Sequence, residues 1–157
     1  MRIAMVSTFY SPTIGGVEKV IEELAVRYVR RGHTVDIFCS DSDKHHRLAK
    51  KSEVIDGVHV HRSRYWLKLS LNTYLFPGVV WDLLWQRYDL VHSHVSAHDY
   101  VLFAGIIAAL KGKPHVHTTH CPWTDKFRPL SVRIPLFFTD RMLNYLSFFF
   151  CDKVIAL

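Results

Sequence analysis

The first forty residues constrain the fold most, because they alternate between two kinds of apolar pattern. Residues 2–8 form a short, continuous apolar run that is typical of a buried strand. From Val17 the apolar residues recur at helical spacing, and Arg30-Arg31-Gly32 supplies the cations and the glycine that commonly end a helix. Thr34–Ser40 is a second buried strand. The pattern predicts a β-α-β unit in which a helix joins two parallel strands.

The alternation continues to the end of the chain. We expect further strands at 58–61, 89–94, 114–119 and 152–157, and helices from about 77, at 99–110 and at 134–150. Residues 41–53 are polar and basic and are predicted to form an exposed connection, and 65–76 a loop. Strands that alternate with helices indicate an α/β fold with a doubly wound parallel sheet, here a single Rossmann-like domain that spans residues 1–157.

Composition restricts the kind of partner without choosing one. The formal charge of +6 favours an anionic partner such as a nucleotide, a phospholipid surface or a nucleic acid, although no recognised nucleic-acid module is present. The three cysteines, Cys39, Cys121 and Cys151, lack zinc spacing and fit a reduced, cytoplasmic protein. No stretch approaches the roughly 20 apolar residues of a membrane span.

In open parallel sheets, ligands bind outside the carboxyl ends of the strands. Four loops meet this condition: 9–16, 41 onward, 94–98 and 120–128. The first contains Gly15-Gly16 directly before a helix, where backbone N–H groups and the helix dipole favour a phosphate or a carboxylate. The alternative is a tight turn into a helix, because the third glycine of a dinucleotide fingerprint is missing.

The eleven histidines suggest several kinds of site. Pairs two residues apart share one face of a strand, but no third ligand completes a convincing metal set, so surface or hydrogen-bonded core positions are the alternative. His94 and His120 differ, because each follows a strand at the predicted ligand edge and can hydrogen-bond a substrate hydroxyl or act as an acid or base. Lys126 lies in a basic loop that suits a phosphate or a membrane, or only solvent. The run 44–51 is interpreted as a charged surface.

Several motifs together resemble the start of family 4 glycosyltransferases. They are Tyr10-Ser11-Pro12, Gly15-Gly16-Val17-Glu18, Arg31-Gly32-His33, the segment Asp89–His94, Thr118-Thr119-His120 and Cys151-Asp152 with the strand that follows. The motifs cover nearly the whole chain in the family's order. The resemblance implies the N-terminal domain of a GT-B enzyme, which transfers a sugar from a nucleotide-diphosphate donor with retention and without a metal cofactor.

The resemblance also assigns roles to residues of this sequence. Gly15 and Gly16 match the glycine loop beside the reacting phosphates, and His120 matches a histidine near the donor sugar. An acceptor, either a carbohydrate or a lipid-linked molecule, is expected to contact four further residues: Tyr10, Glu18, His94 and Lys126.

The family's Glu-x7-Glu pair and its diphosphate-binding Arg and Lys have no counterpart here. We therefore expect a second, C-terminal Rossmann-like domain that binds the nucleotide sugar, and no activity from this chain alone. The apolar end, residues 153–157, agrees with that expectation. The aromatic and basic stretches 62–85 and 126–150 are predicted to touch an anionic membrane surface or, alternatively, to pack in the core and the domain interface.

Two other functions fit the same fold. Sugar-nucleotide 2-epimerases also close two Rossmann-like domains over a donor, although the Gly-Gly-Val-Glu loop argues against them. A stand-alone, non-catalytic flavodoxin-like binding domain is the alternative outside the enzymes, and it would bind a ligand unaided.

Overall fold

A computed structural model describes residues 1–68, 74–95, 98–120 and 130–157 of the chain. Its main sheet contains β1 (Arg2–Val6), β2 (Thr34–Ser40), β3 (Ser52–Ile55), β4 (Val58–Ser63), β7 (Leu90–His94), β8 (His115–Thr119) and β9 (Lys153–Ala156). The helices are α1 (Gly16–Arg30), α2 (Gly78–Trp85), α3 (Asp99–Leu110) and α4 (Leu130–Phe149). Two short strands, β5 (Leu67–Lys68) and β6 (Tyr74–Leu75), pair separately. This mixed α/β architecture confirms the predicted fold class.

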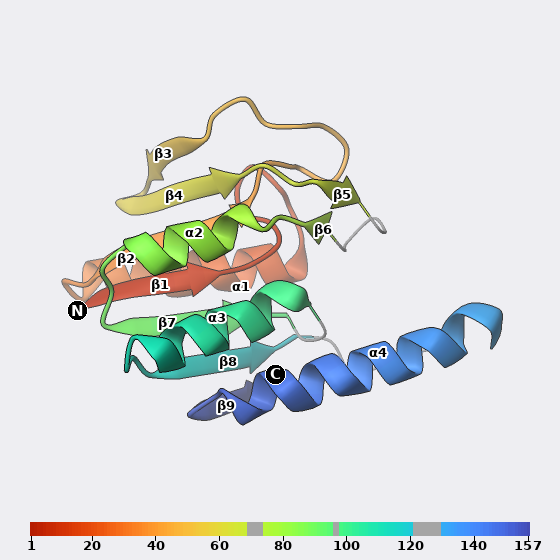
Figure 1. Ribbon diagram of the computed structural model, residues 1–157. Helices are drawn as coiled ribbons and strands as arrows, with labels where there is room; N and C mark the ends of the chain where they lie inside the picture. The colour runs from red at the N-terminus through yellow and green to blue at the C-terminus, as the bar shows by residue number, and fades with distance from the viewer. Residues whose placement is uncertain (69–73, 96–97, 121–129) are drawn as a thin grey trace.

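The order of the strands fixes where a ligand can bind. The sheet runs β3-β4-β2-β1-β7-β8-β9, and all neighbouring pairs are parallel except β3 with β4. The chain order therefore reverses at β1, whose neighbours are β2 on one side and β7 on the other (Figure 1). Such a reversal separates the loops that follow the two adjoining strands and leaves a crevice at their carboxyl ends.

Alternating side chains of the strands build one core on each face of the sheet. Ile3 and Met5 of β1 point to α1 and join the cluster that contains Ile21 and Ala25. Ala4 and Val6 point to the other face, which α2 and α3 cover. Figure 1 shows α1 on one side of the sheet and α2, α3 and α4 on the other. The opposite apolar faces explain why β1 reads as a continuous apolar run.

Three details of the sequence interpretation were wrong. Residues 41–53 are not simply an exposed connection, because Asp41 and Ser42 are buried and β3 begins at Ser52, antiparallel to β4. β3 is a four-residue edge strand with little buried surface, so its apolar pattern is weak. The stretch 65–76 contains β5 and β6, and α4 begins at Leu130, four residues before the expected start.

Among the described helices, none has the length and apolar character needed to cross a membrane.

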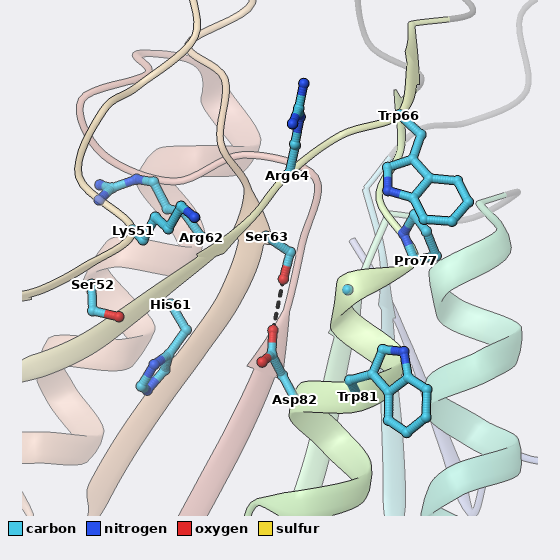
Figure 2. Close-up of a pocket in the computed structure, with 11 residues that line it drawn as sticks. Lys51, Ser52, His61, Arg62, Ser63, Arg64, Trp66, Pro77, Trp81 and Asp82 are labelled. Atoms are coloured by element: carbon cyan, nitrogen blue, oxygen red, sulfur yellow. Dashed lines mark hydrogen bonds between the residues drawn. The ribbon is translucent and has the colours of Figure 1, made fainter.

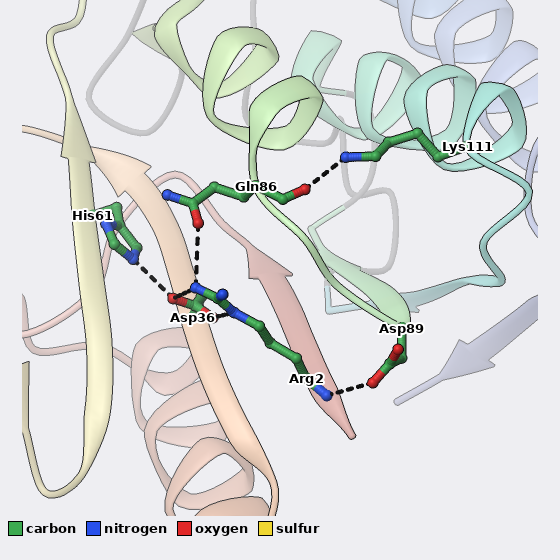
Figure 3. Close-up of polar contacts among 6 residues, drawn as sticks. All are labelled: Arg2, Asp36, His61, Gln86, Asp89 and Lys111. Atoms are coloured by element: carbon green, nitrogen blue, oxygen red, sulfur yellow. Dashed lines mark hydrogen bonds and ion pairs between the residues drawn. The ribbon is translucent and has the colours of Figure 1, made fainter.

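A buried carboxylate joins the strands on the face that α2 covers. Asp36 of β2 accepts hydrogen bonds from Arg2 Nε at 2.6 Å and from His61 Nε2 at 2.9 Å (Figure 3). Arg2 also donates to Gln86 at 3.2 Å, at the end of α2. Burial alone would raise the pKa of Asp36, but the hydrogen bonds from His61 and Arg2 outweigh it and lower the pKa to about 2. The charged carboxylate therefore stabilises the packing of β1, β2 and β4.

We expect Asp36→Ala to lower the free energy of unfolding by about 2 kcal/mol, because it leaves Arg2 and His61 without their acceptor. Asp89→Ala is the matched control, since Asp89 accepts from the Arg2 backbone N–H at 2.7 Å at an exposed position and should cost less than about 1 kcal/mol. Urea unfolding at pH 7 measures both. An equal decrease in the free energy of unfolding for the two variants would show that the buried network stabilises the fold no more than the exposed contact does.

Candidate functional site

The candidate site is centred on two histidines at the carboxyl edge of the sheet, beside the strand-order reversal. His94 ends β7, and His120 follows β8, whose Thr118 is the register partner of His94. Parallel pairing therefore brings the two imidazoles together, and His94 Nδ1 lies 3.0 Å from His120 Nε2. The structure thus joins two residues that sequence analysis selected independently.

Both imidazoles are neutral near pH 7. Burial lowers the pKa of His94 well below its ordinary value, and the neighbouring imidazoles lower it further, above all His92, whose ring centroid lies 4.1 Å away. Burial also lowers the pKa of the partly buried His120, while the negative charge of Glu18 offsets part of that shift. In a neutral pair one nitrogen donates to the other. One nitrogen of His120 then stays outside this hydrogen bond and can meet a ligand.

A chain of hydrogen bonds ties this edge to the neighbouring strands. The Tyr100 hydroxyl donates to the His94 carbonyl at 2.6 Å, and Thr8 Oγ1 donates to the Tyr100 oxygen at 3.3 Å. Ser40 Oγ at the end of β2 donates to the Thr8 carbonyl at 2.6 Å. Val95, directly after His94, has φ 71°, a left-handed conformation that a β-branched residue rarely adopts. The end of β7 is therefore held firmly in a strained conformation, as is common at functional sites.

The glycine loop lies at the N-terminus of α1, next to the ion pair of Glu18 with Lys44. Gly15 precedes the helix, and a Cβ at this position would overlap the carboxylate of Glu18. Gly16 is different, since a Cβ there would meet nothing within 4 Å. Glu18 is largely buried and forms an ion pair with Lys44 Nζ at 3.0 Å. Lys44 is therefore not simply part of a charged surface. Its place after β2, at the ligand edge, is the sequence signal that could have identified it.

The remaining predicted site residues have different surroundings. Tyr10 is 1% exposed and packs in the core beneath α1, so in this conformation it offers almost no surface to an acceptor. Burial raises the pKa of its hydroxyl to about 12. Lys126 lies outside the described residues. Gly15, Glu18, His94 and His120 share one edge of the sheet.

The other histidine pair on these strands belongs to the core. Ser93 Oγ lies 2.8 Å from both His115 Nε2 and His117 Nδ1, on the side of the sheet that α3 covers. Neighbouring β7 and β8 thus carry hydrogen-bonded imidazoles on both faces. Within the described part of the chain, no group of three or more His, Cys, Asp and Glu is arranged to hold a metal ion.

Comparison with known proteins identifies the family of the chain. The model of Glycosyltransferase Family 4 matches residues 14–157, which is nearly the whole chain. The chain belongs to glycosyltransferase family 4. No curated protein sequence matches it. Among solved structures, it is similar to the catalytic domain of starch synthase IV from Arabidopsis thaliana bound to ADP and acarbose. The TM-score is 0.53 at 16% identity over 76% of this chain, a likeness of fold.

The family 4 chain spans about a third of that structure, because the match covers 33% of the starch synthase chain. The resemblance inferred from the glycine and histidine motifs is thereby confirmed at the level of the family.

We expect the stability of this domain to fall as the pH drops from 7 to 5. Burial lowers the pKa values of His92, His98 and His117 to about 4, whereas an unfolded histidine titrates near 6.5. Between these values the unfolded chain binds more protons, so stability rises with pH and is lost on acidification. Urea unfolding should give a free energy at least about 2 kcal/mol lower at pH 5 than at pH 7.

The pH window separates the histidines from the buried carboxylate. Because the pKa of Asp36 falls from 3.8 to about 2, its stabilisation is kept until the pH drops below about 4. A free energy of unfolding that is flat between pH 5 and 7 would contradict the neutral, buried state of the three histidines.

Proposed function

We propose that this chain forms the acceptor-side half of a site that transfers a hexose, with retention, from a nucleotide-diphosphate sugar to an acceptor hydroxyl. The observation that carries the proposal is the His94–His120 pair, placed at the strand-order reversal of a family 4 glycosyltransferase domain. The similar starch synthase domain binds ADP and acarbose, which supports a nucleotide and a carbohydrate as ligands of this fold.

In this proposal His120 is the catalytic-site residue and His94 positions it. His120 is partly exposed and hydrogen-bonds a hydroxyl of the donor sugar. His94 has no exposed surface, so it acts through the 3.0 Å contact that fixes the His120 ring, rather than by touching the acceptor itself. This arrangement lowers the reorganisation needed when the donor binds.

The N-terminus of α1 is proposed to receive the donor diphosphate. The first backbone N–H groups of a helix are unpaired and carry partial positive charge, and the space over Gly16 leaves room for a close approach. Glu18 would oppose an anion there, but Lys44 neutralises it at 3.0 Å. The carboxylate of Glu18 is then the group proposed to accept a hydrogen bond from an acceptor hydroxyl. No metal is part of this proposal, because the backbone N–H groups at the start of α1 are the groups proposed to bind the diphosphate.

The donor half of the site is proposed to come from a second Rossmann-like domain. The support is that the chain spans about a third of the starch synthase structure that it resembles. The donor's base and most of its affinity would then depend on that domain. We accordingly propose that these 157 residues transfer no sugar by themselves.

An acceptor at an anionic membrane surface stays part of the proposal. The support is the formal charge of +6 together with the outer face of α4, where Met142, Tyr145 and Phe149 are exposed. The protein would then work in the cytoplasm, peripherally at the inner face of the membrane. A lipid-linked saccharide is the matching acceptor.

We expect the full-length gene product to release nucleotide from one class among UDP-, GDP- and ADP-sugars, with faster release when lipid extract supplies an acceptor. His120→Ala should reduce the rate at least tenfold, roughly the loss of one hydrogen bond to a substrate. His59→Ala is the matched control, because His59 is an exposed histidine of β4 and should leave the rate unchanged.

The other outcomes favour the alternative functions. Release of a free epimerised sugar would indicate a 2-epimerase. No release from any donor, combined with ligand binding by the 157-residue chain, would favour a non-catalytic binding domain. An equal rate for His120→Ala and wild type would remove His120 from the site.

A further inference from the structure

A pocket that is separate from the His94–His120 site opens at the carboxyl end of β4, on the side of the sheet that α2 covers. Its volume is about 470 Å³. Figure 2 shows two unlike walls, one with Trp66, Pro77 and Trp81, and the other with Lys51 and His61. Arg64 extends from the strand end between them. None of these residues belongs to the His94–His120 site.

The aromatic wall is held in place by contacts between β4 and α2. Gly78 begins α2, and a Cβ at this position would lie 2.8 Å from Ser63 Cβ, so only glycine lets the helix start this close to the strand. Ser63 Oγ donates to Asp82 at 2.6 Å, which fastens the first turns of α2. The Trp66 backbone N–H donates to the Leu75 carbonyl at 2.8 Å. The two indoles are thus carried by well-anchored backbone.

The indoles are far more exposed than tryptophan usually is. Trp66 is 77% exposed and Trp81 is 63% exposed, although burying an indole is strongly favourable. Exposed aromatic side chains beside a pocket commonly mark a binding site. Their flat apolar faces suit the C–H face of a sugar ring, while the polar groups opposite can hydrogen-bond its hydroxyls.

The pocket carries net positive charge. Arg62 is paired with Glu53, at 2.6 Å from Arg62 Nη1, and the other lining cations are Lys51 and Arg64. Asp82 offsets one of these two charges, because the Ser63 hydroxyl that donates to it is neutral. Within the described residues, the side chains of Lys51 and Arg64 form no such ion pair. The pocket therefore favours an anionic ligand.

The pocket and the candidate site share one edge of the sheet. β4 lies three strand spacings from β7 in the order β4-β2-β1-β7, which is roughly 14 Å at about 4.8 Å per spacing. The His94 imidazole lies on the α1 face of the sheet whereas the pocket lies on the α2 face, so an oligosaccharide that reaches both sites passes over the carboxyl edge. We propose that the pocket binds an anionic saccharide, the non-reacting part of an acceptor that carries a carboxylate or a phosphate. This inference rests on the proposed glycosyl transfer. Contacts between the pocket and the non-reacting part of the acceptor would then contribute binding energy to catalysis.

Isothermal titration calorimetry of the 157-residue chain with tetragalacturonate, and with maltotetraose as the uncharged counterpart, tests the proposal directly. We expect tetragalacturonate to bind at least about tenfold more tightly than maltotetraose. Trp81→Ala and Arg64→Ala should each weaken binding of tetragalacturonate by about tenfold.

Matched control variants lie close by. Trp85, one turn further along α2, is 79% exposed but does not line the pocket, and Arg87 is an exposed arginine outside it. Trp85→Ala and Arg87→Ala should bind tetragalacturonate like wild type. Circular dichroism confirms that each variant is folded.

The outcomes separate this proposal from the proposed function. No binding of tetragalacturonate, or equal losses from Trp81→Ala and Trp85→Ala, would overturn the pocket even if the full-length protein releases nucleotide. Binding to phosphatidylglycerol vesicles that Trp81→Ala abolishes and tetragalacturonate does not displace would make this face a membrane contact instead. Saccharide binding in the pocket without nucleotide release from any donor would count against the transferase and not against the pocket.

Discussion

The pairing of β1 with β7 is the constraint on which the rest of the site depends. β1 and β7 are parallel neighbours, but the chain continues from β1 to β2 on one side and from β7 to β8 on the other. The loops that follow the two strands therefore diverge at the carboxyl edge of the sheet. On the other side of β7, the parallel pairing of β7 with β8 brings His120 to His94. Any change of register by one residue would turn His94 to the other face and separate the pair.

Buried imidazoles give this edge its chemical character. Neighbouring strands carry His92 and His94 on one face and His115 and His117 on the other, so charging any of them would be costly. The edge therefore holds neutral hydrogen-bonding groups rather than cations. Beside the glycine loop the charge of Lys44 is paired with that of Glu18, whereas net positive charge lies further along the edge, in the β4–α2 pocket. Neutral donors suit sugar hydroxyls, whereas the cations of the pocket suit phosphates or carboxylates.

Much of the fold follows from the sequence because buried strands and helices form apolar runs of different length, separated by polar or glycine-containing segments. β2 and α3 match their predicted bounds, Thr34–Ser40 and Asp99–Leu110. β3 was missed because it is a four-residue edge strand whose side chains are exposed or only partly buried, so its apolar pattern is weak. Prediction is hardest for short elements whose stability comes from tertiary contacts.

The candidate site was predictable in part for the same reason. His94 and His120 follow strands, so topology alone places them at one edge. The ion pair of Glu18 with Lys44 joins residues 26 positions apart, with most of α1 and all of β2 between them, and the burial of Tyr10 depends on how α1 packs. Neither contact can be recognised from neighbouring residues in the sequence. The family's glycine motif was recognisable, yet only the structure shows that Gly15 makes room for the Glu18 carboxylate whereas Gly16 faces open space.

The central claim is that His120 contacts the donor sugar itself. The most direct measurement compares wild type and His120→Ala of the full-length protein on the accepted donor and on a set of its monodeoxy analogues. The account predicts one analogue on which the two proteins react at the same rate, because the hydroxyl that His120 binds is already missing. If His120→Ala loses the same factor on every analogue, His120 does not bind a sugar hydroxyl, and the account is contradicted.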